Sequence, residues 1–143
     1  MSDGFQPIAL AMIVCDNIHI DPSTGNRTLL GTISLVKCSN YPKVRPLICV
    51  YLVFTECYGP FEFAIQVVHS NEELSPIFAQ KGKITAPLNE PLAVVELDLR
   101  LSNIKFPSPG EYRFQFLCRD AVVCERRITI VDPTARPTAP GKQ

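Results

Sequence analysis

Two histidines, His19 and His69, are the side chains best suited to proton transfer near neutral pH. If the segment around His19 is a strand, Asn17 and Asp21 lie on the same face, because alternate residues of a strand point the same way. Such a set is able to hold a metal ion or act as an acid–base group. A polar strand end that runs into a turn is the simpler interpretation, and we expect it here. His69 is expected to be a surface group.

Other catalytic and cofactor motifs are missing from the sequence. There is no Gly-x-Ser-x-Gly turn and no glycine-rich phosphate loop. A calcium site of the kind found in C2-like sandwiches needs several aspartates at one end of the fold. The candidates are spread along the chain, at Asp16, Asp21, Asp98, Asp120 and Asp132. We therefore expect no catalytic, cofactor-binding or metal-binding residues. A hydrolase that uses His19 or His69 is the weaker alternative, since neither has a visible triad partner.

Six cysteines must be divided between disulfides, metal ligands and packing. They are Cys15, Cys38, Cys49, Cys57, Cys118 and Cys124. No Cys-x-x-Cys pair is present, so a zinc or redox site is not indicated. Most of them lie in apolar, strand-like segments, and we expect free thiols that pack as small hydrophobic groups. The N-terminus has no basic residue before its apolar segment, so we expect a cytoplasmic protein with reduced cysteines.

The charge balance argues against nucleic acid and membrane partners. The 143 residues contain 14 Lys and Arg and 14 Asp and Glu, giving a net charge of zero. The doublet Arg126-Arg127 is too short to mark a nucleic-acid surface. A net charge near zero also gives little protection against self-association, so a homo-oligomer is one expected outcome.

The elements that position these residues are predicted to be strands. Apolar residues repeat at period two, and turn residues interrupt the pattern about every ten residues, which is typical of a sandwich. The first strand is so apolar at its start that we expect both of its faces to be covered. The expected strands are 8–20, 28–38, 47–56, 61–69, 77–84, 92–101, 111–118 and 122–131. We expect one domain over 1–131 and a flexible Pro/Thr/Ala tail over 132–143.

The last hairpin allows its register to be predicted. Pairing Phe114 with Ile128 and Tyr112 with Ile130 places apolar residues opposite one another, whereas a slip by one residue would mix the two faces. This register places Cys118 opposite Cys124, which makes them the one cysteine pair with the geometry for a cross-strand disulfide. Tyr112 follows Gly110-Glu111 at a strand start, as in a tyrosine corner, and we expect it to be structural.

Several short motifs together resemble a known family. They are Val14-Cys15-Asp16, Thr24-Gly25, Leu30-Gly31, Phe106-Pro107-x-Pro109-Gly110-x-Tyr112-x-Phe114 and Cys124-Glu125-Arg126-Arg127. The chain resembles small uncharacterised bacterial proteins, a family of unknown function with an immunoglobulin-like or C2-like β-sandwich. The resemblance covers 8–131 and implies an eight-stranded antiparallel Greek-key sandwich. It implies no active site. Arg119-Asp120-Ala121 departs from the Asp-Gly turn expected there.

These observations favour a non-enzymatic module that binds a protein partner, or a second copy of itself, through a sheet face or a strand edge. A sandwich that binds a small ligand, between the sheets or at a loop end, is the alternative. The tail contains Pro137-Thr138-Ala139-Pro140, a Pro-x-x-Pro pattern, and we expect it to be an unstructured linker rather than a recognition motif.

Overall fold

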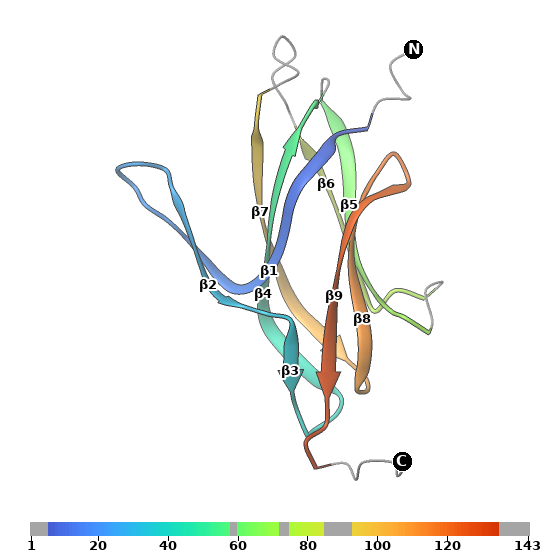
Figure 1. Cartoon of the computed structure of the whole chain (residues 1–143). Helices are drawn as coiled ribbons and strands as arrows, with labels where there is room; N and C mark the ends of the chain where they lie inside the picture. The colour runs from blue at the N-terminus through green and yellow to red at the C-terminus, as the bar shows by residue number, and fades with distance from the viewer. Residues whose placement is uncertain (1–5, 58–59, 72–74, 85–92, 135–143) are drawn as a thin grey trace, which may run out of the picture.

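The computed structural model describes residues 6–57, 60–71, 75–84 and 93–134, and they form two packed β-sheets. The first sheet, sheet A, has the strand order β2-β1-β4-β7, and the second, sheet B, has the order β3-β9-β8-β5-β6 (Figure 1). The strands are β1 (Ile8–Ile20), β2 (Arg27–Thr32), β3 (Leu35–Lys37), β4 (Lys43–Thr55), β5 (Phe61–His69), β6 (Phe78–Ile84), β7 (Val95–Phe106), β8 (Gly110–Cys118) and β9 (Ala121–Val131). The expected all-β fold is confirmed.

The core lies between the two sheets and follows from the period-two pattern. Alternate residues of β5 and β8 point inward, and these strands supply the aromatic centre of the core. Phe116 packs between Phe54 and Phe63, with ring centroids 4.9 and 5.2 Å apart. Between the sheets, beside Val14 and Ile33, the described residues enclose a cavity of only about 10 Å³.

The predicted strand 28–38 is wrong, because it is two strands in different sheets. β2 pairs with β1, whereas β3 crosses to sheet B and pairs in parallel with β9. The described residues therefore form nine strands rather than eight, and not all of them are antiparallel. The chain crosses at residues 33–34, after the end of β2 at Thr32. Gly31, just before that end, has a φ of +66°, and a Cβ there would collide with the Asp16 carboxylate.

Two other predicted boundaries are also corrected. β4 begins at Lys43 and continues through Pro46, whereas the predicted strand began at residue 47. β7 begins at Val95 and extends to Phe106 rather than ending at residue 101, while residue 92 lies outside the described residues. The alternation of buried side chains shifts by one residue at Asn103, whose φ is +57°. A strand predicted from uninterrupted alternation therefore ends before this point. Leu101 is buried before this point, and Ile104 and Phe106 are buried after it.

The predicted register of the last hairpin is wrong by two residues. Phe114 lies opposite Arg126 and Tyr112 lies opposite Ile128. A two-residue shift keeps every side chain on its own face, so side-chain matching could not exclude it. The register is fixed instead by a two-residue turn, Arg119 and Asp120, whose φ values of 52° and 64° suit a tight hairpin. A bulge between Phe116 and Leu117 absorbs one further residue.

The tyrosine corner is confirmed. The Tyr112 hydroxyl donates a hydrogen bond of 2.6 Å to the carbonyl oxygen of Ser108, and the side chain is fully buried. Its ring also meets Phe106 and His69 edge to face, at centroid distances of 5.0 and 4.9 Å. The corner thereby ties the start of β8 to the turn that precedes it.

The corner gives a prediction with an internal control. Tyr112→Phe leaves the Ser108 carbonyl without its partner, so we expect unfolding to become easier by about 1 kcal/mol. Tyr41→Phe removes a hydroxyl that is buried without a hydrogen-bond partner, and it should be neutral or stabilising. Urea denaturation measures both changes. Equal destabilisation by the two variants would contradict a structural role for the corner bond.

Candidate functional site

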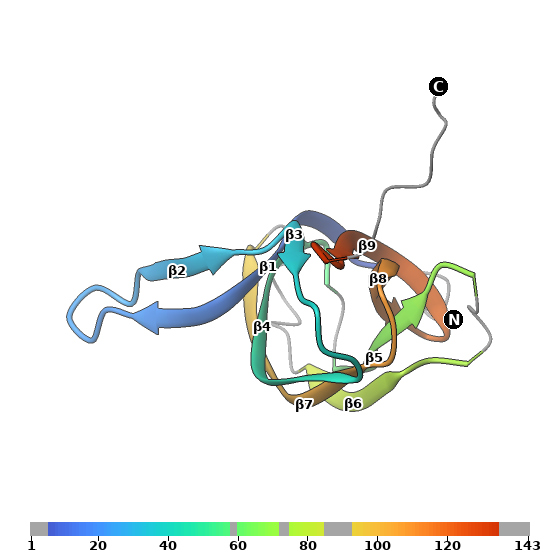
Figure 2. The same cartoon turned by 90° about the horizontal axis from the view of Figure 1, so that it is seen from below.

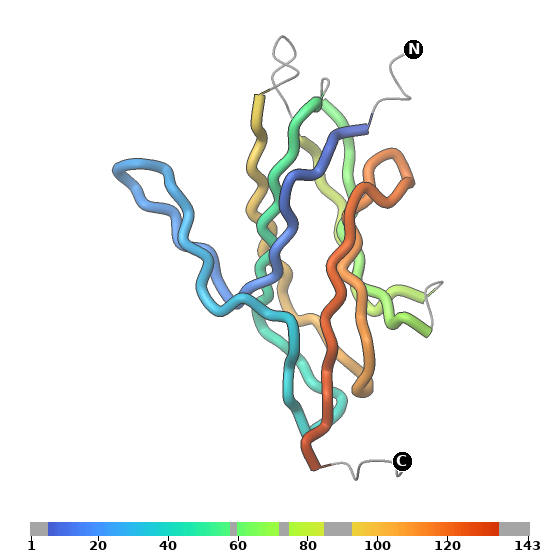
Figure 3. The backbone as a smooth tube through the Cα atoms, in the orientation of Figure 1, coloured from blue at the N-terminus to red at the C-terminus, as the bar shows by residue number. Residues whose placement is uncertain are grey.

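The most distinctive feature of the molecule is a hairpin that projects from sheet A. β1 pairs with β4 from Ile8 to Cys15, and beyond Cys15 it pairs only with β2. We call residues 16–32 the arm. Figures 1 and 3 show the arm leaving the sandwich, and Figure 2 shows that it extends on the side away from sheet B. The arm is thus a two-stranded ribbon that lies largely outside the main core.

A second apolar cluster supports the base of the arm. It consists of Cys15, Ile18 and Cys49, which are 0–3% exposed, with Leu29, Leu47 and Tyr51 packed around them. Cys15 and Cys49 lie directly opposite each other across β1 and β4 and point away from the main core. Because a two-stranded ribbon is marginal by itself, this contact is what allows the arm to hold its shape.

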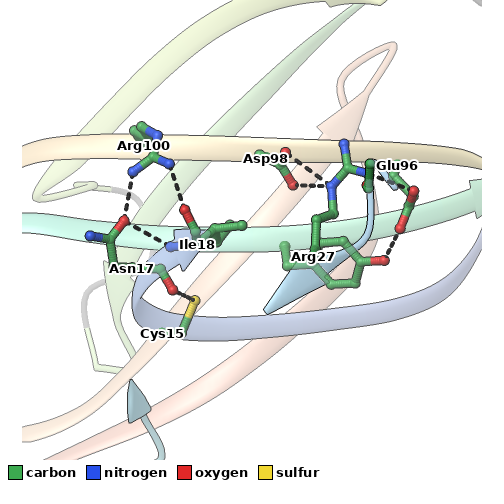
Figure 4. Close-up of polar contacts among 9 residues, drawn as sticks. Cys15, Asn17, Ile18, Arg27, Glu96, Asp98 and Arg100 are labelled. Atoms are coloured by element: carbon green, nitrogen blue, oxygen red, sulfur yellow. Dashed lines mark hydrogen bonds and ion pairs between the residues drawn. The ribbon is translucent and has the colours of Figure 1, made fainter. Parts of the chain in front are cut away.

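Arg100 joins the arm to the far strand of sheet A. It extends from β7 across β4 and donates hydrogen bonds of 2.8 Å to the Asn17 side-chain oxygen and to the Ile18 carbonyl (Figure 4). The Asn17 oxygen also accepts from the Ile18 backbone N–H at 2.8 Å. One guanidinium therefore satisfies polar groups of β1 at the point where β1 has left β4.

Arg27 makes a second connection nearer the tip of the arm. Its Nε lies 2.9 and 3.0 Å from the two carboxylate oxygens of Asp98, and its Nη1 lies 2.7 Å from Glu96 (Figure 4). The hydrogen bond to Asp98 raises the pKa of Arg27. Tyr51 donates to the other oxygen of Glu96, and burial raises the pKa of Tyr51 to about 12, so it stays a neutral donor. Four side chains from three strands thus form one network.

The arm keeps large apolar side chains in contact with solvent. Ile20 and Leu30 are 43% and 47% exposed. The tip itself is a polar turn, in which the Asp21 carboxylate accepts from the Ser23 hydroxyl at 2.7 Å and from the Ser23 N–H at 2.8 Å. These bonds lower the pKa of Asp21. The arm therefore combines a fixed backbone with apolar side chains that the described residues leave uncovered.

The residues considered for a metal or acid–base site do not converge. Asn17 is held by Arg100, Asp21 closes the turn, and His19 is exposed opposite Thr28. Within the described ranges, no three His, Cys, Asp or Glu side chains form a group suited to a metal ion. Three other aspartates each contact a different partner: Asp16 pairs with Arg45 at 2.7 Å, Asp98 pairs with Arg27, and Asp132 accepts the Thr134 N–H. Asp120 lies in the β8–β9 turn.

His69 is a packing residue rather than the surface group that we expected. Its ring stands against Tyr112, and its Nδ1 accepts the Asn71 N–H at 3.1 Å. It also fills the space beside Gly110, where a Cβ would come within 2.6 Å of its Nε2. Gly110 has a φ of +142°, so a side chain at this position would be strained as well as crowded.

The cysteines are free thiols. The corrected register places Cys118 opposite Ala121 and Cys124 opposite Phe116, so the geometric case for a Cys118–Cys124 disulfide is withdrawn. The pair that does lie face to face is Cys15 and Cys49, from strands whose relative register could not be read from the sequence. The Pro137–Pro140 motif lies outside the described residues.

The contacts of the polar face of β7 cannot be read from the sequence. Glu96, Asp98 and Arg100 alternate with apolar residues along this strand, and this pattern gives their face but not their partners. Their partners Arg27 and Asn17 are about seventy to eighty positions away in the chain, and no local pattern connects them. In the part of the chain that the structure describes, no helix is long and apolar enough to cross a membrane.

Comparison with known proteins gives a family but no activity. A family model described as a family of unknown function, DUF6941, matches residues 10–131. The match covers both sheets and the whole arm, so the features described above lie within the matched region. No curated protein matches the chain.

The contacts of Arg27 predict how the arm loosens. In Arg27→Gln, Asp98 loses its charged partner, and we expect a loss of about 1 kcal/mol in stability together with faster amide hydrogen exchange across residues 16–32. Arg45→Gln is the comparison, because it removes the ion pair at the base of the arm to Asp16, whose side chain is 55% exposed, and it should loosen the arm less. Unchanged exchange in the arm of Arg27→Gln would show that the Arg27 network does not hold the arm.

The second apolar cluster predicts thiol reactivity. Burial raises the pKa of both Cys15 and Cys49, so little of the reactive thiolate forms. In the native protein near neutral pH, both should be alkylated much more slowly than the half-buried Cys38. Peptide mass spectrometry after timed labelling measures each site. If Cys49 were labelled as fast as Cys38, the arm would not cover this cluster in solution.

Proposed function

The chain belongs to the DUF6941 family, and from its structure we propose that it is a non-enzymatic module that presents the arm to a protein partner. The observation that carries the proposal is that the arm is fixed by Arg27 and Arg100 while Ile20 and Leu30 stay exposed. A rigid ribbon loses little conformational entropy on binding. Burying the exposed half of each apolar side chain would contribute about 1 kcal/mol.

Two kinds of partner fit this surface. A second copy of the chain is one, since the net charge of zero does not oppose self-association. A different protein is the other. We propose that the fold is a Greek-key sandwich of the immunoglobulin-like or C2-like kind, which the tyrosine corner supports. We also propose that the protein is bacterial and that it is cytoplasmic, and its free cysteines agree with the second of these.

Small-ligand binding is the less supported alternative. The space between the sheets is too small for a ligand, at about 10 Å³. A surface concavity of about 470 Å³ lies on the outer face of sheet B, and its lining mixes basic, acidic and apolar residues, among them Lys81, Lys83 and Asp120. No set of polar groups there points to one class of small ligand.

The arm hypothesis is tested with two matched leucine variants. Leu30→Lys changes the arm, and Leu35→Lys changes a leucine of β3 that is 54% exposed. We expect Leu30→Lys to abolish association and Leu35→Lys to leave it intact. Sedimentation velocity measures self-association, and a photo-crosslinker at position 30 or 35, read by mass spectrometry in the native lysate, identifies another partner. A monomer with equal crosslinking from both positions would refute the proposal.

A further inference from the structure

The free edge of β2 is the outer edge of sheet A at the arm. β2 is the end strand of this sheet, so among the described residues β1 is its only strand neighbour. Figure 2 shows β2 on the side of the arm away from β4 and β7. Backbone N–H and C=O groups on such an edge can pair with a strand of another chain.

Leu29 directs its backbone N–H and C=O toward this free edge. Its register partner is Ile18, whose N–H bonds a side-chain oxygen of β1 and whose carbonyl accepts from Arg100, so both groups of Ile18 point away from β2. Partners in an antiparallel ladder alternate between pairs that bond each other and pairs that face outward. The Asp21 N–H donates to the Asn26 carbonyl at 2.8 Å, and counting from this bonded pair also makes residues 18 and 29 an outward-facing pair. The backbone groups of Leu29 are therefore available to a second strand.

The edge of β2 lacks the charges that protect the other end strands of the two sheets. β3, β6 and β7 each contain lysine, which discourages pairing with another chain. β2 contains none, and its one charged residue, Arg27, is bound to Asp98 and Glu96 of the same chain. The uncharged part of β1 that precedes Cys15 lies beside β9 (Figures 1 and 2). The edge of β2 is thus the open edge best suited to pairing.

The sequence of β2 is complementary to itself when two copies pair antiparallel about Leu29. Leu29 then lies opposite its counterpart, and Thr28 lies opposite Leu30. Arg27 lies opposite Gly31, which has no side chain to obstruct it. No like charges face each other in this register, and Thr28 covers the exposed side chain of Leu30.

Charge selects this register over the neighbouring one. Gly31 lies under the Asp16 carboxylate, because a Cβ on Gly31 would collide with that group. Nη2 of Arg27 makes no hydrogen bond with a described residue, so the guanidinium is able to meet the Asp16 carboxylate of a second copy, whose side chain is 55% exposed. Pairing about Leu30 instead would set the apolar Leu29 against this carboxylate. Charge complementarity therefore favours pairing about Leu29.

We infer that a second copy of the chain occupies this edge, with the two β2 strands paired about a two-fold axis at Leu29. The inference rests on the proposed function, since it names the partner of the arm. The two four-stranded sheets then form one continuous sheet across the dimer. Both copies use the same residues, so the contact closes on itself and leaves no edge of β2 for a third copy.

Two substitutions at position 29 test the backbone pairing. Leu29→Ala and Leu29→Pro both remove the leucine side chain, but only the proline removes the N–H that is donated across the edge. Sedimentation velocity on the whole chain should show a dimer for the wild type and for Leu29→Ala. We expect Leu29→Pro to dimerise about thirtyfold more weakly than Leu29→Ala, because the two hydrogen bonds at the axis are lost. The amide signals of β8 show in each variant whether the fold is intact.

Single cysteines test the register without a proline. Thr28→Cys and Leu30→Cys are each made in a Cys38→Ser background and oxidised with glutathione disulfide. Opposite residues of an outward-facing pair have Cα atoms about 4.5 Å apart, which suits a disulfide. A mixture of the two variants should therefore form covalent dimers that contain one chain of each. Either variant alone is the control and should form few, because its cysteine lies opposite the other position.

Three results would overturn the inference. They are a wild-type chain that stays monomeric, a Leu29→Pro variant that dimerises as well as Leu29→Ala, and a cysteine mixture that cross-links no more than its separate components. The proposed function fails differently. A monomer whose photo-crosslinker at position 30, but not at position 35, captures another protein excludes the second copy and keeps the arm as the binding surface.

Discussion

Strand β1 changes partners at Cys15, and the organisation of sheet A depends on that change. Up to Cys15 the strand pairs with β4 and contributes Met12 and Val14 to the main core. After it, the strand pairs only with β2 and leads away from the sandwich. The backbone groups and side chains that lose β4 as a neighbour need other partners. The second apolar cluster and the contacts from Arg100 supply them.

In the arm, hydrogen bonds from long polar side chains replace most of the packing contacts that a hydrophobic core provides elsewhere in the molecule. The apolar cluster has three buried residues, too few to hold a ribbon by hydrophobic contact alone. Both arginines make charge-assisted hydrogen bonds across sheet A. Arg27 of β2 donates to Asp98 of β7, and Arg100 of β7 donates to Asn17 of β1. Each such contact contributes modestly because it is partly solvated, but together they fix the direction of the arm.

The interior and the outer faces of the molecule differ in character. Large aromatic rings pack between the sheets, and the cavity beside Val14 and Ile33 has a volume of only about 10 Å³. The two outer faces differ in kind. Sheet A offers exposed apolar groups on a projecting ribbon, whereas sheet B offers concavities lined by basic and acidic side chains together. The two faces are therefore chemically distinct.

The sequence by itself determined which side chains lie inside. The alternation in 61–69 and 111–118 predicted the buried faces of β5 and β8, and Gly110-Glu111-Tyr112 predicted a tyrosine corner, whose acceptor in the structure is Ser108. It also predicted two covered faces for β1. This holds at Val14 and Cys15, whereas Ile8 and Leu10 are 47% and 55% exposed. Alternation is a local property, set by the geometry of each strand, which is why it can be read without the fold.

Pairing was decided by the tertiary structure alone. The two-residue error in the last hairpin kept every face correct, so only the positive φ values at Arg119 and Asp120 could select the register. The division of 28–38 between two sheets, the meeting of Cys15 with Cys49, and the reach of Arg27 to Asp98 join segments that are distant in the chain. The alternation of apolar and polar residues shows which way a side chain points but not which strand lies beside it, because neighbouring strands are determined by packing of the whole sandwich.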